Sequence, residues 1–315
     1  MSSKRIARLG ILATVLALIA GGLFVLWPTS SEHAVTSTTQ TIPSAVAIEP
    51  GTFAPGACMK YQPTAASNGH LVFLDAGHGG IDPGGVGSTQ GGVMVKESTT
   101  ALAVALQTSD LLRSQGYTVV LSRTTDSTVV PLTPSNTNGS VFNIQGAHDD
   151  VAARDACADA AGAALLIGIY FDAGVPTAAG SLAAYDTARP FAAENLKIAT
   201  LVQTDVLASM NKHGWEIPDD GVQSDEHLGS YVPQAGNSIA ALAAKYNHIM
   251  LLGPAEAGYF ETPSQMPGMI IEPLYVTDPF EGTIAASALG QKAMADGIAK
   301  AVLQYFAKPK KGSAG

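Results

Sequence analysis

The chain has few charged side chains, and basic ones are in the minority. Only 14% of its 315 residues are charged, with 17 Lys and Arg against 26 Asp and Glu, which gives a formal net charge of −9. A nucleic-acid binder collects phosphate contacts through clustered basic side chains. The composition therefore argues against a nucleic-acid partner.

Cysteine is also scarce, with Cys58 and Cys157 as the two in the chain. In an oxidising compartment they could form a disulfide across a long loop, which would tie the residues before the main domain to it. The spacing does not say whether the two sulfur atoms approach each other. A disulfide and two buried free thiols therefore stay open as alternatives.

The N-terminal segment lacks the polar face and the capping residue of an amphipathic soluble helix. Lys4, Arg5 and Arg8 precede an apolar run over residues 9–27, close to the ~20 residues that cross a bilayer. No small-x-small cleavage site closely follows the run, which favours an uncleaved signal anchor over a cleaved signal peptide. The basic residues before it predict a cytoplasmic N-terminus and an exported remainder.

The chain length and the 46% hydrophobic content suit one sizeable core. We expect a signal anchor or signal peptide over residues 1–27, followed by a Ser/Thr/Pro-rich linker over 28–68. An α/β domain over 69–307 would follow, and then a solvated basic tail over 308–315.

Within the expected domain, apolar runs alternate with amphipathic stretches. Strands are expected at 71–75, 118–122, 164–170, 181–185, 249–252 and 269–272, and helices at 97–115, 149–161, 191–212 and 287–306. Residues 214–247 mix Gly, Asp, Ser and Pro around a helical-looking 238–246, and we interpret them as an insertion near a cleft. The alternation predicts βαβ units, and with them a single three-layer α/β domain whose twisted, mostly parallel sheet is flanked by helices.

A glycine-rich stretch, DAGHGG over residues 75–80, follows the first expected strand and contains His78. Ligands of an open α/β sheet bind at the carboxyl ends of its strands, so His78 falls where a site is expected. The stretch lacks the lysine and the G-x-x-x-x-G-K-S/T spacing of a phosphate-binding loop, which argues against that alternative.

Two glutamates are further candidates. Glu97 starts the next expected helix, where its carboxylate can return toward His78. Acidic residues favour helix starts without any function, so Glu97 taken alone is better explained as structural. Glu272 ends a buried apolar strand in the sequence MPGMIIEP over residues 266–273, and a buried acid usually needs a partner or a role.

Together these motifs resemble the zinc-dependent N-acetylmuramoyl-L-alanine amidases, peptidoglycan hydrolases with a D-x-G-H-G-G start and an M-P-x-x-x-x-E finish. The resemblance runs over residues 70–307 and includes LSR at 121–123 with Asp126, Arg154 in the following helix, and the IGI strand at 167–169. It implies that His78 and Glu97 bind zinc and that Glu272 is the catalytic acid/base. A zinc-activated water would attack the lactyl amide between muramic acid and L-alanine, and Glu272 would pass its proton to the leaving amine.

One position departs from the family pattern. The sequence GIYFD spans residues 168–172, and the resemblance implies a histidine as third metal ligand where this chain has Tyr170. A phenol binds a metal well only after it loses its proton, for which the ordinary pKa is ~10. Tyr170 could bind zinc as a phenolate, Asp172 or His227 could replace it, or the site could hold no metal.

The sequence therefore predicts a peptidoglycan hydrolase of the bacterial cell envelope with zinc as its expected cofactor. Its expected partners are peptidoglycan and the membrane to which the N-terminal segment anchors it, or peptidoglycan alone if a cleaved signal makes it secreted. The alternative, motivated by the missing histidine, is a catalytically silent amidase-like domain. Such a domain would bind peptidoglycan or regulate another cell-wall hydrolase.

Overall fold

The structure is a computed structural model that describes residues 45–226, 228 and 238–307. The apolar segment at 9–27, His227 and the basic tail at 308–315 lie outside the described residues. Among the helices within the described ranges, none is both long enough and apolar enough to cross a membrane.

The centre of the fold is an eight-stranded sheet in the order β1-β2-β6-β3-β9-β12-β10-β11. Its strands are β1 Ala45–Ala47, β2 Ala57–Tyr61, β3 Leu71–Ala76, β6 Thr118–Arg123, β9 Leu165–Ile169, β10 Ser181–Tyr185, β11 Asp219–Ser224 and β12 Gly268–Glu272. Strands β6, β3, β9 and β12 run parallel, as do β10 and β11, whereas β12 pairs antiparallel with β10. At the other edge, β1 and β2 are antiparallel additions.

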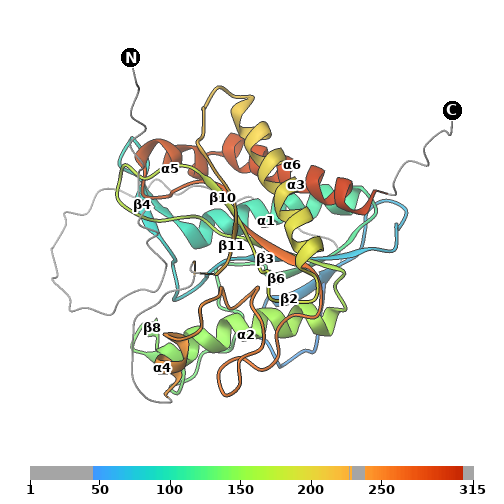
Figure 1. The fold of residues 1–315 in the computed structure, drawn as a ribbon, viewed down its shortest axis with the longest axis vertical. Coiled ribbons are helices and arrows are strands. Elements are labelled where there is room, and N and C mark those ends of the chain that lie inside the picture. Colours follow the sequence, from blue (N-terminus) through green and yellow to red (C-terminus); the bar gives the residue numbers. More distant parts are fainter. Residues whose placement is uncertain (1–44, 227, 229–237, 308–315) are drawn as a thin grey trace.

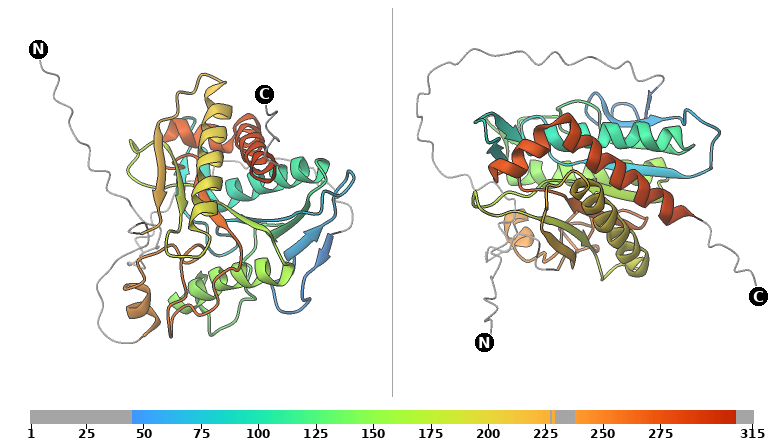
Figure 2. Two further views of the ribbon diagram at one scale, coloured as in Figure 1. Left: turned by 45° about the vertical axis from the view of Figure 1, so that its right-hand side comes forward. Right: turned by 90° about the horizontal axis from the view of Figure 1, so that it is seen from above.

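Helices cover both faces of the sheet and give three layers (Figure 1, Figure 2). Helices α1 (Glu97–Ser114), α3 (Ala192–Asn211) and α6 (Ala288–Phe306) pack on one face, and α2 (Ile144–Ala161) packs on the other. Val72 and Leu74 of β3 face the three-helix layer, whereas Phe73 faces α2. Both faces are buried, so the central strands are continuous apolar runs, and the expected single α/β domain is confirmed.

Short elements complete the chain. They are β4 Val86–Ser88 with β5 Met94–Lys96, β7 Thr137–Asn138 with β8 Val141–Phe142, α4 Ile239–Ala243 and α5 Pro279–Ala286. Helices α2 and α5 differ most from the sequence prediction. Helix α2 starts before position 149 because the Asn143 side chain caps it, accepting a hydrogen bond from Gly146 N at 2.8 Å. Helix α5 was not predicted, and it starts with a proline after the capping residue Asp278.

Two predictions about loops and strands are wrong, and a third is correct only in part. The linker expected at 28–68 does not extend through its described part, because β1 and β2 lie there and join the sheet. The insertion expected near a cleft at 214–247 does line a pocket, through Leu228, Ala243 and Tyr246, but it also contributes strand β11 beside β10. Residues 249–252 form turns instead of a strand. Edge strands such as β1 and β11 bury little apolar surface, so their sequences lack the pattern that reveals a core strand.

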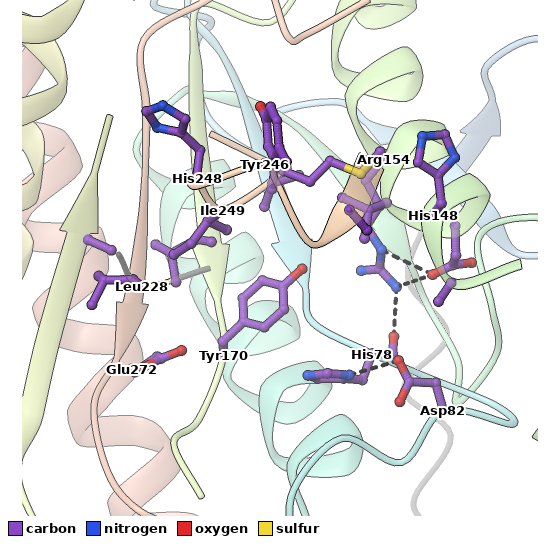
Figure 3. A pocket seen from close by; sticks show the side chains of 18 of the residues that line it. His78, Asp82, His148, Arg154, Tyr170, Leu228, Tyr246, His248, Ile249 and Glu272 are labelled. Carbon is purple, nitrogen blue, oxygen red and sulfur yellow. Dashed lines mark hydrogen bonds and ion pairs between the residues drawn. The ribbon is translucent and has the colours of Figure 1, made fainter. Parts of the chain in front are cut away.

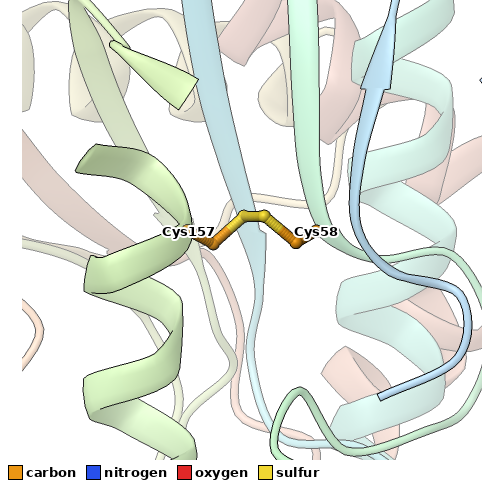
Figure 4. The surroundings of a disulfide bond; sticks show 2 residues. All are labelled: Cys58 and Cys157. Atoms are coloured by element: carbon orange, nitrogen blue, oxygen red, sulfur yellow. A yellow bond between two sulfur atoms is a disulfide. The ribbon is translucent and has the colours of Figure 1, made fainter. Parts of the chain in front are cut away.

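Cys58 of β2 and Cys157 of α2 form a disulfide, with their Cα atoms 5.6 Å apart (Figure 4). Both residues are fully buried in the core beneath α2. Of the two alternatives that the sequence left open, the structure contains the disulfide. The bridge joins positions 99 residues apart and ties the β1-β2 edge of the sheet to α2.

We expect loss of this bridge to lower the free energy of unfolding by about 2–4 kcal/mol, because the unfolded chain loses a constraint. Chemical denaturation of a Cys58→Ala/Cys157→Ala variant against oxidised wild type measures the difference. A reductant should bring the wild type to the stability of the variant and leave the variant unchanged. Equal stability of the oxidised wild type and the variant would contradict the bridge.

Candidate active site

The strand order brings the carboxyl ends of β3, β9 and β12 to one edge of the sheet. His78 follows β3, Tyr170 follows β9 and Glu272 ends β12. Glu97 is the first residue of α1. All four residues line one pocket of about 290 Å³. Figure 3 shows His78, Tyr170 and Glu272 around it. The residues selected from the sequence thus lie together, in the position expected for the ligand crevice of an open α/β sheet.

His78 is held by two carboxylates and by the shape of its loop. Its φ of 57° is a left-handed conformation, and the following Gly79 and Gly80 also have positive φ values. Its Nδ1 lies 2.8 Å from Asp82 Oδ2, and its Nε2 lies 3.1 Å from Glu97 Oε1. Both ring nitrogens therefore face carboxylate oxygens, which fixes the orientation of the ring.

Glu97 is oriented by backbone amides from two other segments. Its Oε1 accepts a hydrogen bond from Phe171 N at 2.9 Å, and its Oε2 accepts one from Gly85 N at 2.8 Å. A Cβ at Gly84 would lie 2.6 Å from both Glu97 Oε2 and His78 Cδ2. A side chain at position 84 would therefore clash with both residues, and glycine lets the backbone pack against them. The two amide hydrogen bonds orient the Glu97 carboxylate toward His78.

The carboxylates control the charge of His78. Burial lowers the pKa of His78, but the charge of Glu97 and the hydrogen bonds from Asp82 and Glu97 outweigh it and raise the pKa to about 10. Burial raises the pKa of Asp82, but the hydrogen bond and the ion pair with His78 lower it by more. The net shift of the Asp82 pKa is therefore downward. Two carboxylates around one imidazole make this end of the pocket attractive to a cation.

Tyr170 is hydrogen-bonded to a buried ion pair. Its hydroxyl donates to Asp75 Oδ2 at 2.8 Å, and Arg154 donates to Asp75 Oδ1 at 2.6 Å. The rings of Tyr170 and His78 meet edge-on with centroids 5.5 Å apart, and the hydroxyl points away from the imidazole toward the Arg154 side (Figure 3). Burial and the charge of Asp75 raise the pKa of the Tyr170 phenol well above its ordinary value. The hydroxyl therefore acts as a hydrogen-bond donor.

Two buried arginines hold the loop that carries His78. Arg154 donates to the carbonyl oxygens of Ala76 and His78, each at 2.8 Å. Arg123 donates to Ala76 O at 3.0 Å and to Gly77 O at 2.8 Å. These two arginines were landmarks of the family resemblance, and their contacts give a physical reason for their presence, because they satisfy loop carbonyls that cannot pair within the sheet.

Glu272 lies beside a second acid, Asp172. Burial and the charges of Asp172 and Glu97 raise the pKa of Glu272 well above its ordinary value. Burial also raises the pKa of Asp172 to about 6, against hydrogen bonds from Tyr275 and from the Ala173 backbone. Neighbouring buried carboxyl groups do not readily ionise together. The raised pKa means that Glu272 binds a proton readily.

The sequence prediction did not select Asp75 and Asp82, which bind Tyr170 and His78. Asp75 begins the glycine-rich stretch at 75–80, and Asp82 lies just after it, four positions after His78. A carboxylate so close to a candidate metal-binding histidine is a signal that could have identified Asp82, because such histidines commonly bond to an acid through their second nitrogen. His227, a possible replacement ligand, lies outside the described residues.

The sequence model of one protein family, described as N-acetylmuramoyl-L-alanine amidase, matches residues 72–304. The chain belongs to this amidase family. The matched range contains His78, Glu97, Tyr170 and Glu272, so the pocket lies within the amidase domain. Membership of the N-acetylmuramoyl-L-alanine amidase family, which the motifs predict, is confirmed.

Two curated amidases align with most of the chain. The germination-specific N-acetylmuramoyl-L-alanine amidase of Bacillus subtilis is 26% identical over 239 residues, which cover 76% of this chain and 81% of that protein. The N-acetylmuramoyl-L-alanine amidase AmiA of Escherichia coli is 25% identical over 261 residues, which cover 78% of this chain and 80% of that protein. The similarity therefore extends over the whole amidase domain.

Solved amidase structures share the fold. The CwlD amidase of Clostridioides difficile, solved in complex with the GerS lipoprotein, has a TM-score of 0.53 and 19% identity, covering 75% of this chain and 98% of that one. The amidase AmiC2 of Nostoc punctiforme has a TM-score of 0.50 and 21% identity, covering 76% of this chain and 98% of that one. These similarities support the amidase fold alone.

We expect Tyr170→Phe to lower the free energy of unfolding by about 1.5–3 kcal/mol, because it removes a hydrogen bond to the buried carboxylate of Asp75. Chemical denaturation measures the loss. Tyr185→Phe, at a half-buried strand position, is the matched control and should change stability by no more than about 0.5 kcal/mol. A loss at Tyr170 no larger than the control would show that the bond to Asp75 does not stabilise the fold.

Proposed function

We propose that the chain hydrolyses the amide bond between N-acetylmuramic acid and L-alanine in peptidoglycan. Membership of the amidase family supports this reaction, and the curated relatives carry it in their names. The observation on which the proposal rests is that His78, Glu97 and Glu272 line one pocket. Metal-assisted amide hydrolysis requires side chains that bind a cation and a carboxylate that accepts a proton from water. His78 and Glu97 could serve the first purpose and Glu272 the second.

Glu272 moves the proton in this proposal. Its carboxylate takes a proton from the attacking water and passes it to the nitrogen of the leaving L-alanine. Burial and the neighbouring Asp172 raise the pKa of Glu272. A raised pKa makes the carboxylate a stronger base toward water, and it keeps the proton available for the leaving group.

We propose zinc as the cofactor, with His78 and Glu97 among its ligands. The donor atoms His78 Nε2 and Glu97 Oε1 are 3.1 Å apart, close to the ~3.4 Å expected between two ligands of one tetrahedral zinc ion. Asp82 on the other ring nitrogen supplies the carboxylate that commonly orients a zinc-binding histidine. When bound, zinc lowers the pKa of water and polarises the amide carbonyl.

The third ligand position does not fit a zinc site. The Tyr170 hydroxyl donates to Asp75 and is turned away from His78, whereas a catalytic zinc usually has three protein ligands. Of the interpretations that the sequence left open, binding by a Tyr170 phenolate is therefore the least supported. We infer that the His78 and Glu97 pair binds zinc more weakly than a three-ligand site would.

The position of Tyr170 also favours a second candidate function. A catalytically silent amidase-like domain would keep the pocket to bind peptidoglycan, or would regulate another cell-wall hydrolase. Tyr170 would then serve the fold through its bond to Asp75. The two candidates differ in whether the wild-type chain cleaves the amide bond.

We further propose that the domain acts in the cell envelope, outside the cytoplasmic membrane. The disulfide between Cys58 and Cys157 is typical of an oxidising compartment. The apolar run at residues 9–27, preceded by basic residues, is typical of a signal anchor whose downstream part is exported. Peptidoglycan would then be the substrate, and the membrane would hold the enzyme near it.

Glu272→Gln should slow release of stem peptides from purified peptidoglycan by about 10²–10⁴-fold, because the amide side chain cannot carry the transferred proton. Chromatography of the released peptides measures the rate, and circular dichroism checks the fold. The exposed Glu256→Gln is the matched control and should keep the wild-type rate. Full activity of Glu272→Gln would remove Glu272 from the proposed mechanism.

Tyr170→His separates the two candidate functions. The imidazole would supply the missing donor, so zinc affinity should rise by more than the roughly 10–100-fold that an outer-shell contact contributes, and peptide release should become faster. Tyr170→Phe is the control, since it removes the hydroxyl without adding a ligand, and should gain neither property. If Tyr170→His releases peptides and the zinc-supplied wild type releases none, the silent domain is favoured. Zinc-dependent release by the wild type would reject the silent domain.

A further inference from the structure

A second cluster of possible metal ligands lies at the carboxyl ends of β10 and β11. Asp186 follows Tyr185 at the end of β10, and Asp225 follows Ser224 at the end of β11. The strands are parallel neighbours, and Asp225 N donates to Tyr185 O at 2.8 Å. The parallel pairing therefore brings two carboxylates together at this edge.

His248 completes the cluster. Its Nδ1 lies 3.1 Å from Asp186 Oδ2 and 3.3 Å from Asp225 Oδ1. One ligand atom from each of the three residues lies within 4.8 Å of the other two. His248 also lines the amidase pocket, on the side away from His78 (Figure 3).

The carboxylate oxygens of Asp186 and Asp225 receive too few hydrogen bonds from their described neighbours. Asp186 and Asp225 are both 0% exposed. Asp225 Oδ2 accepts from Ile249 N at 3.0 Å, and Asp225 Oδ1 contacts His248 Nδ1. Asp186 Oδ1 accepts from Arg189 N at 2.7 Å, but Asp186 Oδ2, which faces His248, accepts no hydrogen bond from any residue that the structure describes. A fully buried carboxylate oxygen in this state is costly unless a cation or a donor meets it.

Arg189 and His248 are basic side chains close to the two acids, and neither supplies a hydrogen bond to Asp186 Oδ2. The Arg189 guanidinium donates instead to Leu252 O at 3.3 Å and to Ser264 Oγ at 3.1 Å. His248 Nδ1 can carry one proton, and that proton cannot bond well to Asp186 and Asp225 together. A cation between the three side chains would satisfy all of them.

We propose that Asp186, Asp225 and His248 bind a divalent transition-metal ion, and Zn²⁺ is the ion that we propose. Two carboxylate oxygens and one imidazole nitrogen form a donor set that suits Zn²⁺ and also Mn²⁺. Binding displaces the proton from Nδ1, and the two carboxylates balance the charge of the ion. The ion ties the ends of β10 and β11 to the segment around His248, which forms one wall of the pocket. This role is structural and independent of the proposed hydrolysis.

Zinc content of variants of the full chain tests the proposal. A His78→Ala/Glu97→Gln variant lacks the first pair of donors, and after equilibration with zinc and removal of the excess it should retain one ion per chain. Inductively coupled plasma mass spectrometry measures the amount. Adding Asp186→Asn and Asp225→Asn to this variant should abolish the retained zinc.

The matched control is a substitution in another pair of a histidine and an acid in the same protein. His148 Nδ1 lies 3.0 Å from Asp149 Oδ1, in a pair that has one carboxylate instead of two. Asp149→Asn in the same background should leave the retained zinc unchanged. Unchanged zinc in the variant that lacks both Asp186 and Asp225 carboxylates would overturn the proposal.

Crystals of the unmutated chain grown with zinc give a test that does not depend on the folding of a variant. Anomalous scattering at the zinc edge should give a peak within about 2.0–2.2 Å of Asp186 Oδ2, Asp225 Oδ1 and His248 Nδ1. The lack of a peak there would overturn the proposal and leave His248 Nδ1 in contact with two carboxylates and no ion. A peak there in a chain that releases no stem peptide would support this site while contradicting the proposed hydrolysis alone.

Discussion

The active-site geometry depends on the buried ion pair between Asp75 and Arg154. Arg154 projects from α2 and also bonds to Asp150 on its own helix. Its remaining hydrogen bonds go to the carbonyl oxygens of Ala76 and His78. Breaking a buried ion pair leaves an uncompensated charge and typically costs about 3–5 kcal/mol. The pair therefore fixes the end of β3 against α2, and with it the backbone from which His78 projects.

The same ion pair determines what Tyr170 does. Strands β3 and β9 are parallel neighbours, so Tyr170 emerges beside Gly77, where a Cβ would come within 2.5 Å of the tyrosine ring. The absence of a side chain at Gly77 lets the phenol reach Asp75. The chain thus combines the amidase fold with a pocket that contains His78, Glu97 and Glu272, while Tyr170 hydrogen-bonds to Asp75.

Local sequence patterns predicted the buried core and missed what depends on distant partners. Strand β10 has the expected bounds, and β3, β6 and β12 are each one residue longer than expected, because strands covered on both faces are uninterrupted apolar runs. Strands β1 and β11 have polar or very short sequences and form by pairing with strands already in place. The direction of Tyr170 could not be predicted, because its partner Asp75 lies 95 positions away on a neighbouring strand.

The central claim is that the pocket serves to cut one particular bond, and mass spectrometry of peptidoglycan fragments after treatment with the purified, zinc-supplied chain tests it most directly. An N-acetylmuramoyl-L-alanine amidase gives free stem peptides that begin with L-alanine, together with glycan strands that carry peptide-free muramic acid. That pair of products is the predicted result. Cuts within the glycan or within the stem peptide, or fragments left unchanged, would contradict the claim.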